Sequence, residues 1–244
     1  MKSHIYDTLG ARFQTTRWEL IAKASKPQGA EHEQALEELC QIYWPALYSF
    51  IRRKGFSSAD SQDLTQDFLF QLIKGTMLET VEAEKGRFRS FLAACCNNFI
   101  SNHRDAANTI KRGGGIQFIS LDFVATELKY EAELGHSVTP EKEFVRKWAT
   151  LLLARVMIKL GEDYREDGKE AIFRALYPVL IGNRKELTYR ELAELVGTSE
   201  ANIQVMVHRL RRKFSDLLRE EVRATLVDPS ELDEEIRFLI AAVS

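Results

Sequence analysis

Apolar residues recur every three or four positions along most of the chain, and almost no segment shows the alternation of a strand. Pro45 is expected to kink or break the longest of the helical segments. In the first half, the pattern predicts a short helix after the capping box of Thr16 and Glu19, then helices over 31–54, from Ser57 or Ser58 to Gly75, and over 88–111. The sequence therefore predicts an all-α fold.

The stretch from Leu187 to Phe214 predicts two helices joined by a tight turn. Thr188 and Glu191 form a capping box for the first helix, and Gly197 allows a sharp turn after it. Ser199 then caps the second helix. Its apolar residues make one buried stripe: Ile203, Val207, Leu210, Phe214 and Leu217. This is the pattern of a DNA-binding helix-turn-helix, although two packed helices in an ordinary bundle would share the glycine turn.

The 244 residues are enough for two modest helical domains. Periodicity is lost between the glycines at 113–115 and Pro140, so a flexible linker is expected there, with a short ordered piece at 119–123. The predicted domains are an N-terminal extension with a short helix (1–30), a first helical domain (31–113), the linker (114–140), a second domain with the helix-turn-helix (141–225) and a C-terminal helical tail (226–244).

Charge is unevenly distributed, although the formal net charge is only −2 and the pI is near 6.3. Residues 85–112 hold six basic residues and one acid, which gives +5 locally. Residues 119–145 hold six acids against two lysines. Two basic segments that could face DNA are thus separated by an acidic connector.

Several classes of protein find little support in the sequence. The three cysteines include no C-x-x-C pair, which favours a reducing, cytoplasmic location. No apolar run reaches the roughly 18 residues that span a bilayer, and no signal core opens the chain, so no membrane insertion is expected. Cys95 and Cys96 lie about two helical turns, or about 11 Å, from His103, too far to share a small ion. We therefore expect no metal, no cofactor and no catalytic residue.

Two segments of the first domain present polar side chains. Asp63, Gln66, Asp67 and Gln71 project from one helix face, which suits a protein partner or is merely a solvated surface. A second segment mixes basic, aromatic and amide side chains: Arg87, Phe88, Arg89, Phe91, Asn97, Asn98, His103 and Arg104. Such groups can stack on unpaired bases and bind phosphates, although aromatic residues at the helical spacing of Phe88, Phe91 and Phe99 more often pack in a core.

The order of these features resembles the extracytoplasmic-function class of bacterial RNA polymerase sigma factors, over roughly Glu31 to Val222. The resemblance implies that Asp63, Leu64, Gln66, Asp67 and Phe68 bind the polymerase clamp helices. It implies that Phe88 to Arg112, with Lys111 and Arg112, opens the minus-ten promoter element. Core RNA polymerase (clamp helices and flap), promoter DNA and an anti-sigma factor are the implied partners. The Thr15–Trp18 segment and the tail resemble an expanded planctomycete-type subgroup.

By the same resemblance, the helix over Ser199 to Lys213 recognises the minus-thirty-five element. Its outward residues can contact base edges: Ser199, Glu200, Ala201, Gln204, Val205 and His208. Its basic residues are better placed to bind phosphates: Arg209, Arg211, Arg212 and Lys213. Two features depart from the common pattern, because Asn97-Asn98 replaces an Arg-Asn step and Gln204-Val205-Met206 replaces a basic and hydroxyl run.

The sequence thus predicts a promoter-specificity subunit without enzymatic activity that promotes strand opening for transcription initiation. The alternative is a free-standing helix-turn-helix transcriptional regulator that binds duplex DNA without polymerase, with the tail as a candidate dimerisation helix. A nucleic-acid enzyme would need a metal or acid–base constellation that the sequence does not show.

The C-terminal tail has two possible roles. Ser230 can cap a helix on which Leu232, Ile236, Leu239 and Val243 share one face. That helix is expected either to strap the second domain or, through its acids, to shield the Arg209–Lys213 cluster until polymerase or a signal displaces it. Removal of 228–244 should then strengthen promoter binding.

Overall fold

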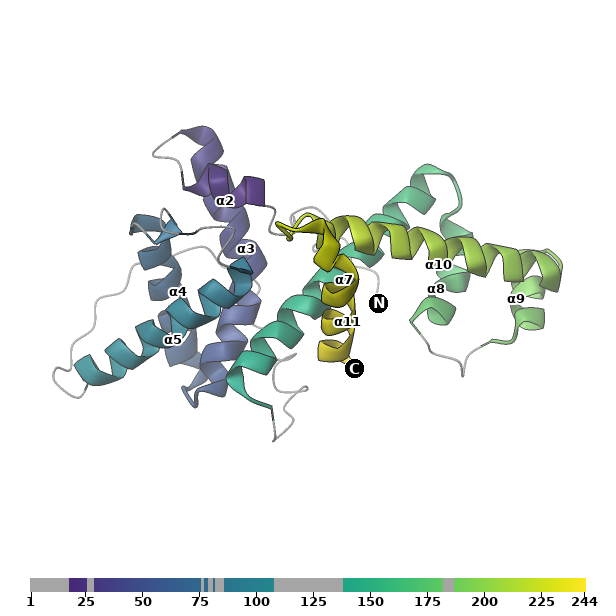
Figure 1. Cartoon of the computed structure of the whole chain (residues 1–244). Helices are drawn as coiled ribbons and strands as arrows, with labels where there is room; N and C mark the ends of the chain where they lie inside the picture. Colours follow the sequence, from purple (N-terminus) through teal and green to yellow (C-terminus); the bar gives the residue numbers. More distant parts are fainter. Residues whose placement is uncertain are drawn as a thin grey trace. The chain divides into compact units, whose positions relative to one another are not determined.

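The computed structural model describes residues 18–25, 29–75, 77–78, 81, 86–107, 138–181 and 187–244, and within them it contains helices and no strand (Figure 1). The all-α prediction is confirmed. The α-helices are α2 (Trp18–Ala24), α3 (Ala30–Arg53), α4 (Ser58–Lys74), α5 (Phe88–Ala107), α7 (Pro140–Glu166), α8 (Glu170–Leu180), α9 (Tyr189–Val196), α10 (Glu200–Arg223) and α11 (Leu232–Val243). None of these described helices combines the length and the apolar character that crossing a bilayer requires.

The described residues fall into two compact units. Residues within 12–151 together with 224–244 form one, here called the amino-terminal unit, and residues 152–223 form the helix-turn-helix unit. This division differs from the expected one, because the first turns of α7 and the whole tail group with the amino-terminal unit. Large apolar side chains explain the difference, since Phe144 and Trp148 of α7 are almost fully buried.

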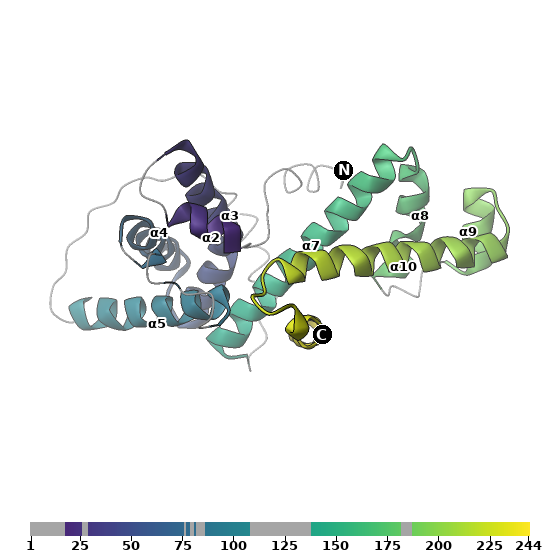
Figure 2. The same ribbon diagram turned by 45° about the horizontal axis from the view of Figure 1, so that its top comes forward.

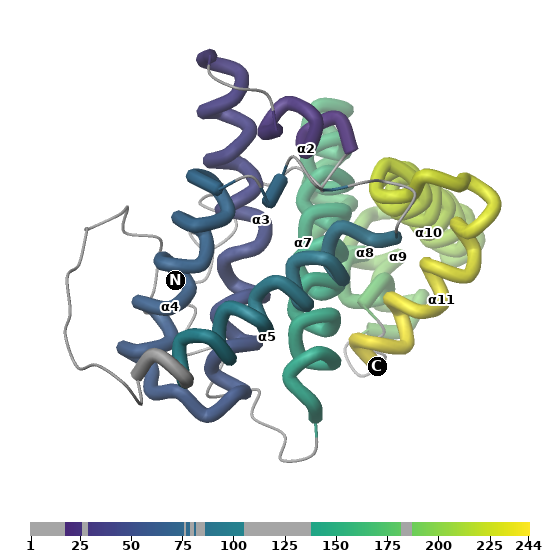
Figure 3. Tube along the Cα trace, turned by 60° about the vertical axis from the view of Figure 1, so that its left-hand side comes forward, coloured from purple at the N-terminus to yellow at the C-terminus, as the bar shows by residue number. Residues whose placement is uncertain are grey.

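The core of the amino-terminal unit is built around α3, with α4 and α5 packed beside it (Figure 3). The Phe144 ring stacks 6.4 Å from Tyr43 and meets Phe50 edge-on at 6.2 Å. Phe88, the first residue of α5, packs edge-on against Tyr43 at 5.4 Å. Aromatic packing of this kind contributes beyond the area it buries, so the start of α7 belongs to this core.

Helix α3 continues without interruption through Pro45, and the expected break is absent. A proline inside a helix removes one backbone hydrogen bond and crowds the preceding turn. Here Tyr43 and Trp44 before it and Ala46 and Leu47 after it are all buried. Burial of both flanks outweighs the local cost of the proline, which is a tertiary effect that periodicity alone does not reveal.

The helix-turn-helix unit packs α8 and α9 against α10 (Figure 2). Leu176 from α8, Leu192 from α9, and Ile203 and Leu210 from α10 have no exposed surface. A buried carboxylate, Glu221, faces α7, where Arg155 Nε lies 3.6 Å from Oε2 and Lys159 Nζ lies 3.6 Å from Oε1. The apolar stripe of α10 therefore faces inward as predicted, and its opposite face is left for solvent.

Several helix termini can be compared with their predicted signals. Ser57 is the N-cap of α4, with its hydroxyl accepting from the Asp60 N–H, and Gly75 ends that helix. In the tail, Asp228 takes the capping role expected of Ser230, because a short 3-10 turn (Pro229–Glu231) precedes α11. Thr16 and the segment 108–137, which includes the linker piece at 119–123, lie outside the described residues.

Candidate nucleic-acid interface

The turn between α9 and α10 has the geometry that the sequence predicts. The Thr188 hydroxyl accepts from the Glu191 N–H, and the Glu191 carboxylate accepts from the Thr188 N–H at 2.6 Å, which completes the capping box. Gly197 has a left-handed backbone, with φ of 74°. The Ser199 hydroxyl accepts from the Asn202 N–H at 3.3 Å, so α10 starts with its predicted cap. Local hydrogen bonds thus fix the direction of α10 relative to α9.

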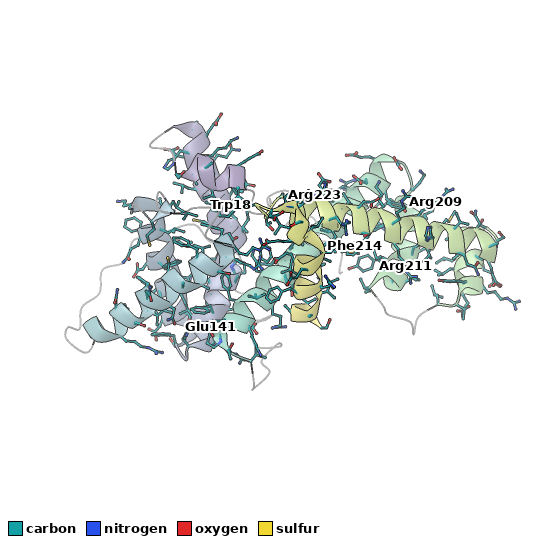
Figure 4. The ribbon with its side chains drawn as sticks, in the orientation of Figure 1. Trp18, Glu141, Arg209, Arg211, Phe214 and Arg223 are labelled. Atoms are coloured by element: carbon teal, nitrogen blue, oxygen red, sulfur yellow. The ribbon has the colours of Figure 1, made fainter. Side chains whose placement is uncertain are left out.

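The outward side of α10 is open to solvent. The predicted base-contacting residues are all exposed: Ser199, Glu200, Ala201, Gln204, Val205 and His208. The predicted phosphate-binding residues Arg209, Arg211 and Arg212 are also exposed, and Figure 4 labels two of them on α10. Consecutive helical residues are about 100° apart, so Arg209 and Arg211 flank the buried Leu210 on either side. The surface is apolar and amide-rich at the start of α10 and cationic in its middle.

Lys213 differs from these three arginines because it is half-buried and contacts α7. Its Nζ lies 3.0 Å from Asp163 Oδ2 and 5.5 Å from the centre of the Tyr164 ring, both on α7. Burial raises the pKa of Tyr164, so its ring offers Lys213 a neutral aromatic surface. A lysine held in this way stabilises the packing of α7 on α10, and its contribution to binding phosphate is correspondingly reduced.

The basic residues at the start of α5 lie in a different environment. Arg87 Nη2 lies 2.8 Å from Glu231 Oε2, and its Nε lies 3.3 Å from Glu235 Oε2. Arg89 Nη1 lies 2.6 Å from Glu235 Oε1. The Arg89 guanidinium also stands over two rings, 5.0 Å from Trp148 and 5.6 Å from Phe238. Both arginines are therefore engaged by acids of the tail.

The remaining α5 residues differ in accessibility. Phe88 is buried and packs in the core, as the second interpretation of these rings allowed, while Phe91 and Asn97 are half-buried and Asn98 and His103 are exposed. Arg104 donates to the Lys54 carbonyl at 2.7 Å and stands 4.9 Å from the Phe56 ring. Lys111 and Arg112 lie outside the described residues.

The acidic and amide face of α4 is accessible. Asp63, Asp67 and Gln71 are exposed and Gln66 is half-buried, whereas Leu64, Phe68 and Leu72 point into the core. Burial anchors the helix through one side, and the opposite side is free for a partner of complementary charge.

The described thiols behave as packing residues. Burial raises the pKa of Cys40 and of Cys96 to about 12, so neither supplies a thiolate near neutral pH. Within the described part of the chain, no three acidic, histidine or cysteine side chains converge as metal ligands would.

The contacts of the tail with α5 are the main feature that the sequence did not reveal. The acids of the tail and the +5 charge of residues 85–112 are both visible in the sequence, but the predicted basic target of the tail was the Arg209–Lys213 cluster. Arg87 and Glu235 are 148 residues apart, and no local pattern pairs them.

Comparison with known proteins gives a distant relative of this chain. The chain is similar to a bacterial sigma factor. It is 22% identical to RNA polymerase sigma factor YlaC of Bacillus subtilis (strain 168) over 198 residues, which is 79% of this chain and 99% of the relative. No family model matches the sequence, and no solved structure matches it. The similarity is distant, but it extends across nearly the whole length of that relative.

Proposed function

We propose that the chain is an RNA polymerase sigma factor that binds core polymerase, recognises promoter DNA and promotes strand opening, without catalysis of its own. The helix-turn-helix, with its capped turn and exposed α10 face, is the observation that carries the proposal. Similarity to YlaC over 99% of that protein supports it, because the similarity extends well beyond the helix-turn-helix. The extracytoplasmic-function class, its planctomycete-type subgroup and an anti-sigma partner are finer parts of the same proposal.

In this proposal, α10 reads the upstream promoter element. Gln204 can pair with adenine, and Val205 can contact a thymine methyl group. Arg209, Arg211 and Arg212 bind phosphates, which fixes the register of the helix on DNA without adding sequence preference. Two predicted base-contacting residues, Ala201 and Val205, are apolar and one, Glu200, is acidic, so α10 alone holds DNA weakly. A net charge of −2 fits a subunit whose DNA affinity comes largely from the polymerase.

The amino-terminal unit has the other two roles. The exposed face of α4 binds the polymerase clamp helices through Asp63, Gln66, Asp67 and Gln71. The exposed Asn98 and His103 of α5 contact the melted strand, with the half-buried Phe91 and Asn97 beside them. This separation places polymerase binding and DNA binding on different helices, so the two activities can be broken independently.

Reconstitution with core polymerase and run-off transcription on genomic fragments tests the proposal. We expect specific transcripts that require the protein, and a holoenzyme that elutes as one species in gel filtration. A free-standing regulator would instead footprint promoter DNA without polymerase and would not bind the core enzyme. Leu232 and Leu239, which a dimerisation helix would need on its surface, are buried within the chain.

The variant Asp67→Arg tests the polymerase-binding face directly. Reversing one exposed charge at the centre of that face should weaken core binding by at least about 100-fold, because like charges across an interface repel strongly. Glu37→Arg makes the same change on an exposed position of α3 and should bind normally. Equal binding by the two variants, with both folded by circular dichroism, would remove α4 as the polymerase-binding surface.

A further inference from the structure

The acidic tail lies on the basic start of α5, within one compact unit. The short 3-10 turn contributes Glu231 and α11 contributes Glu235, and between them they pair with both guanidinium groups at 2.6 to 3.3 Å. The Arg89 and Glu235 side chains are only 6% and 5% exposed. Leu232 and Leu239 are buried as well, so apolar contacts fix α11 in place beside the ion pairs.

The stability of the fold alone does not explain why the chain buries the ion pair of Arg89 and Glu235. Removing two charges from water costs about as much as their attraction returns, and apolar residues of similar size often serve the fold equally well. The rings of Trp148 and Phe238 already lie within 6 Å of the Arg89 guanidinium as apolar partners. The chain nevertheless places two carboxylates here, on a segment where five acids accompany two arginines from 223 onward.

Carboxylates and phosphates compete for the same guanidinium groups. Both anions accept paired, charge-assisted hydrogen bonds from arginine with similar geometry. An arginine held by Glu231 or Glu235 therefore has fewer donors and less uncompensated charge to offer a DNA phosphate.

We propose that the tail helix is an intramolecular competitor of promoter DNA. Glu231 and Glu235 occupy Arg87 and Arg89 in the free protein, and displacement of α11 releases both arginines to bind the phosphates of the melted strand. The inference rests on the proposed function and adds a regulatory step to it. It also changes the expected target of the tail from the Arg209–Lys213 cluster to the start of α5.

The double variant Glu231→Gln/Glu235→Gln in the full chain tests this competition. Binding to a labelled single-stranded oligonucleotide of mixed sequence should strengthen on the order of tenfold, because α11 loses its ion pairs and the DNA displaces it from the two arginines more readily. The slope of log affinity against log salt should steepen by about 1.4, at about 0.7 for each new phosphate contact. Asp233→Asn/Glu234→Gln removes two charges from exposed positions of α11 and serves as the matched control. Equal affinity and slope in the double variant and the control would overturn the proposal.

Two further measurements guard against a variant that misfolds. Arg87→Ala in the double-variant background should reverse about half of the gain in salt slope, and failure to do so would also overturn the proposal. In the unaltered protein, hydrogen exchange of α11 amides should be faster in the holoenzyme–promoter complex than in the free chain. Unchanged exchange would mean that α11 is a fixed strap.

The proposed function is tested separately by run-off transcription with the unaltered holoenzyme. If that holoenzyme initiates while the glutamine variants bind like the control, only the competition is wrong. If it does not initiate at all, the sigma-factor proposal fails regardless of how the variants bind.

Discussion

Both α5 and α10 carry several arginines, but the arginines of the two helices have different surroundings. On α10, Arg209, Arg211 and Arg212 extend into solvent. On α5, Arg87 and Arg89 are paired with tail acids, and Arg104 is held by a backbone carbonyl and an aromatic ring. The first set is available to an anionic partner immediately, whereas the second is already part of the fold.

The difference shows that an arginine's role depends on the groups around it. Its positive charge alone does not determine that role. An exposed arginine contributes little to stability, and its effect is sensitive to salt. A buried arginine paired with a carboxylate is costly to disturb, because loss of either member leaves the other charged and poorly solvated. Variants on the two helices should therefore fail in different assays.

The largest expected effect on stability comes from Arg89→Ala. Removing this guanidinium leaves Glu235 buried, and breaking such a pair typically costs about 3–5 kcal/mol. Arg87 also lies 3.3 Å from Glu235, so we expect the lower end, about 3 kcal/mol. Urea unfolding followed by tryptophan fluorescence measures it, because Trp18, Trp44 and Trp148 all belong to the amino-terminal unit.

The matched change on α10 is Arg209→Ala. Because that side chain is exposed, its removal should alter stability by no more than about 0.5 kcal/mol. A similar loss of stability in both variants would contradict the distinction between the two helices.

The next largest effect concerns DNA binding by α10. Arg211→Ala/Arg212→Ala should weaken binding of the holoenzyme to duplex promoter DNA on the order of tenfold or more, with about the same loss on unrelated sequences. The salt slope should fall by about 0.9 per lost phosphate contact. Arg165→Ala/Arg174→Ala, which removes two exposed cations from α7 and α8, is the control. A sequence-specific loss would instead assign base recognition to the cations.

Features that depend on neighbouring residues could be predicted from the sequence, whereas contacts between distant helices could not. The capping box at Thr188, the turn at Gly197 and the buried stripe of α10 each depend on residues within one or two helical turns. The pairing of Arg87 with Glu235 depends on how distant helices pack. The same holds for the placement of Phe144 in the amino-terminal core, and for the uninterrupted helix at Pro45. Charge counts identified the acidic tail and the basic segments, but the sequence predicted the Arg209–Lys213 cluster as the target of the tail, whereas the tail acids pair with Arg87 and Arg89.

A smaller effect is expected at the turn that directs α10. Gly197 has a φ of 74°, and an added Cβ would meet no atom within 4 Å, so Gly197→Ala carries only the conformational cost. That cost is about 1–2 kcal/mol. Gly197→Asn should lose less, because asparagine tolerates this region. Urea unfolding followed by circular dichroism measures this loss of stability. Equal losses for alanine and asparagine would mean that the turn is not conformationally limited.

The smallest effect is a pH dependence in the capping box. The Thr188 N–H, and then its hydroxyl, donate to the Glu191 carboxylate and hold the pKa of that group below its ordinary value of 4.5. A carboxyl whose folded pKa is lowered stabilises the fold fully above its unfolded pKa, and this stabilisation is lost as pH falls through the folded pKa. The stability difference between the unaltered protein and Glu191→Gln should therefore be constant near pH 7 and shrink below about pH 4.5. Glu194→Gln removes the same charge from α9 without altering the capping box. The stability of this control should depend on pH in the same way as that of the unaltered protein. Thermal unfolding by circular dichroism from pH 7 to pH 3 measures it, and a difference that does not vary with pH would show that the box acts without its charge.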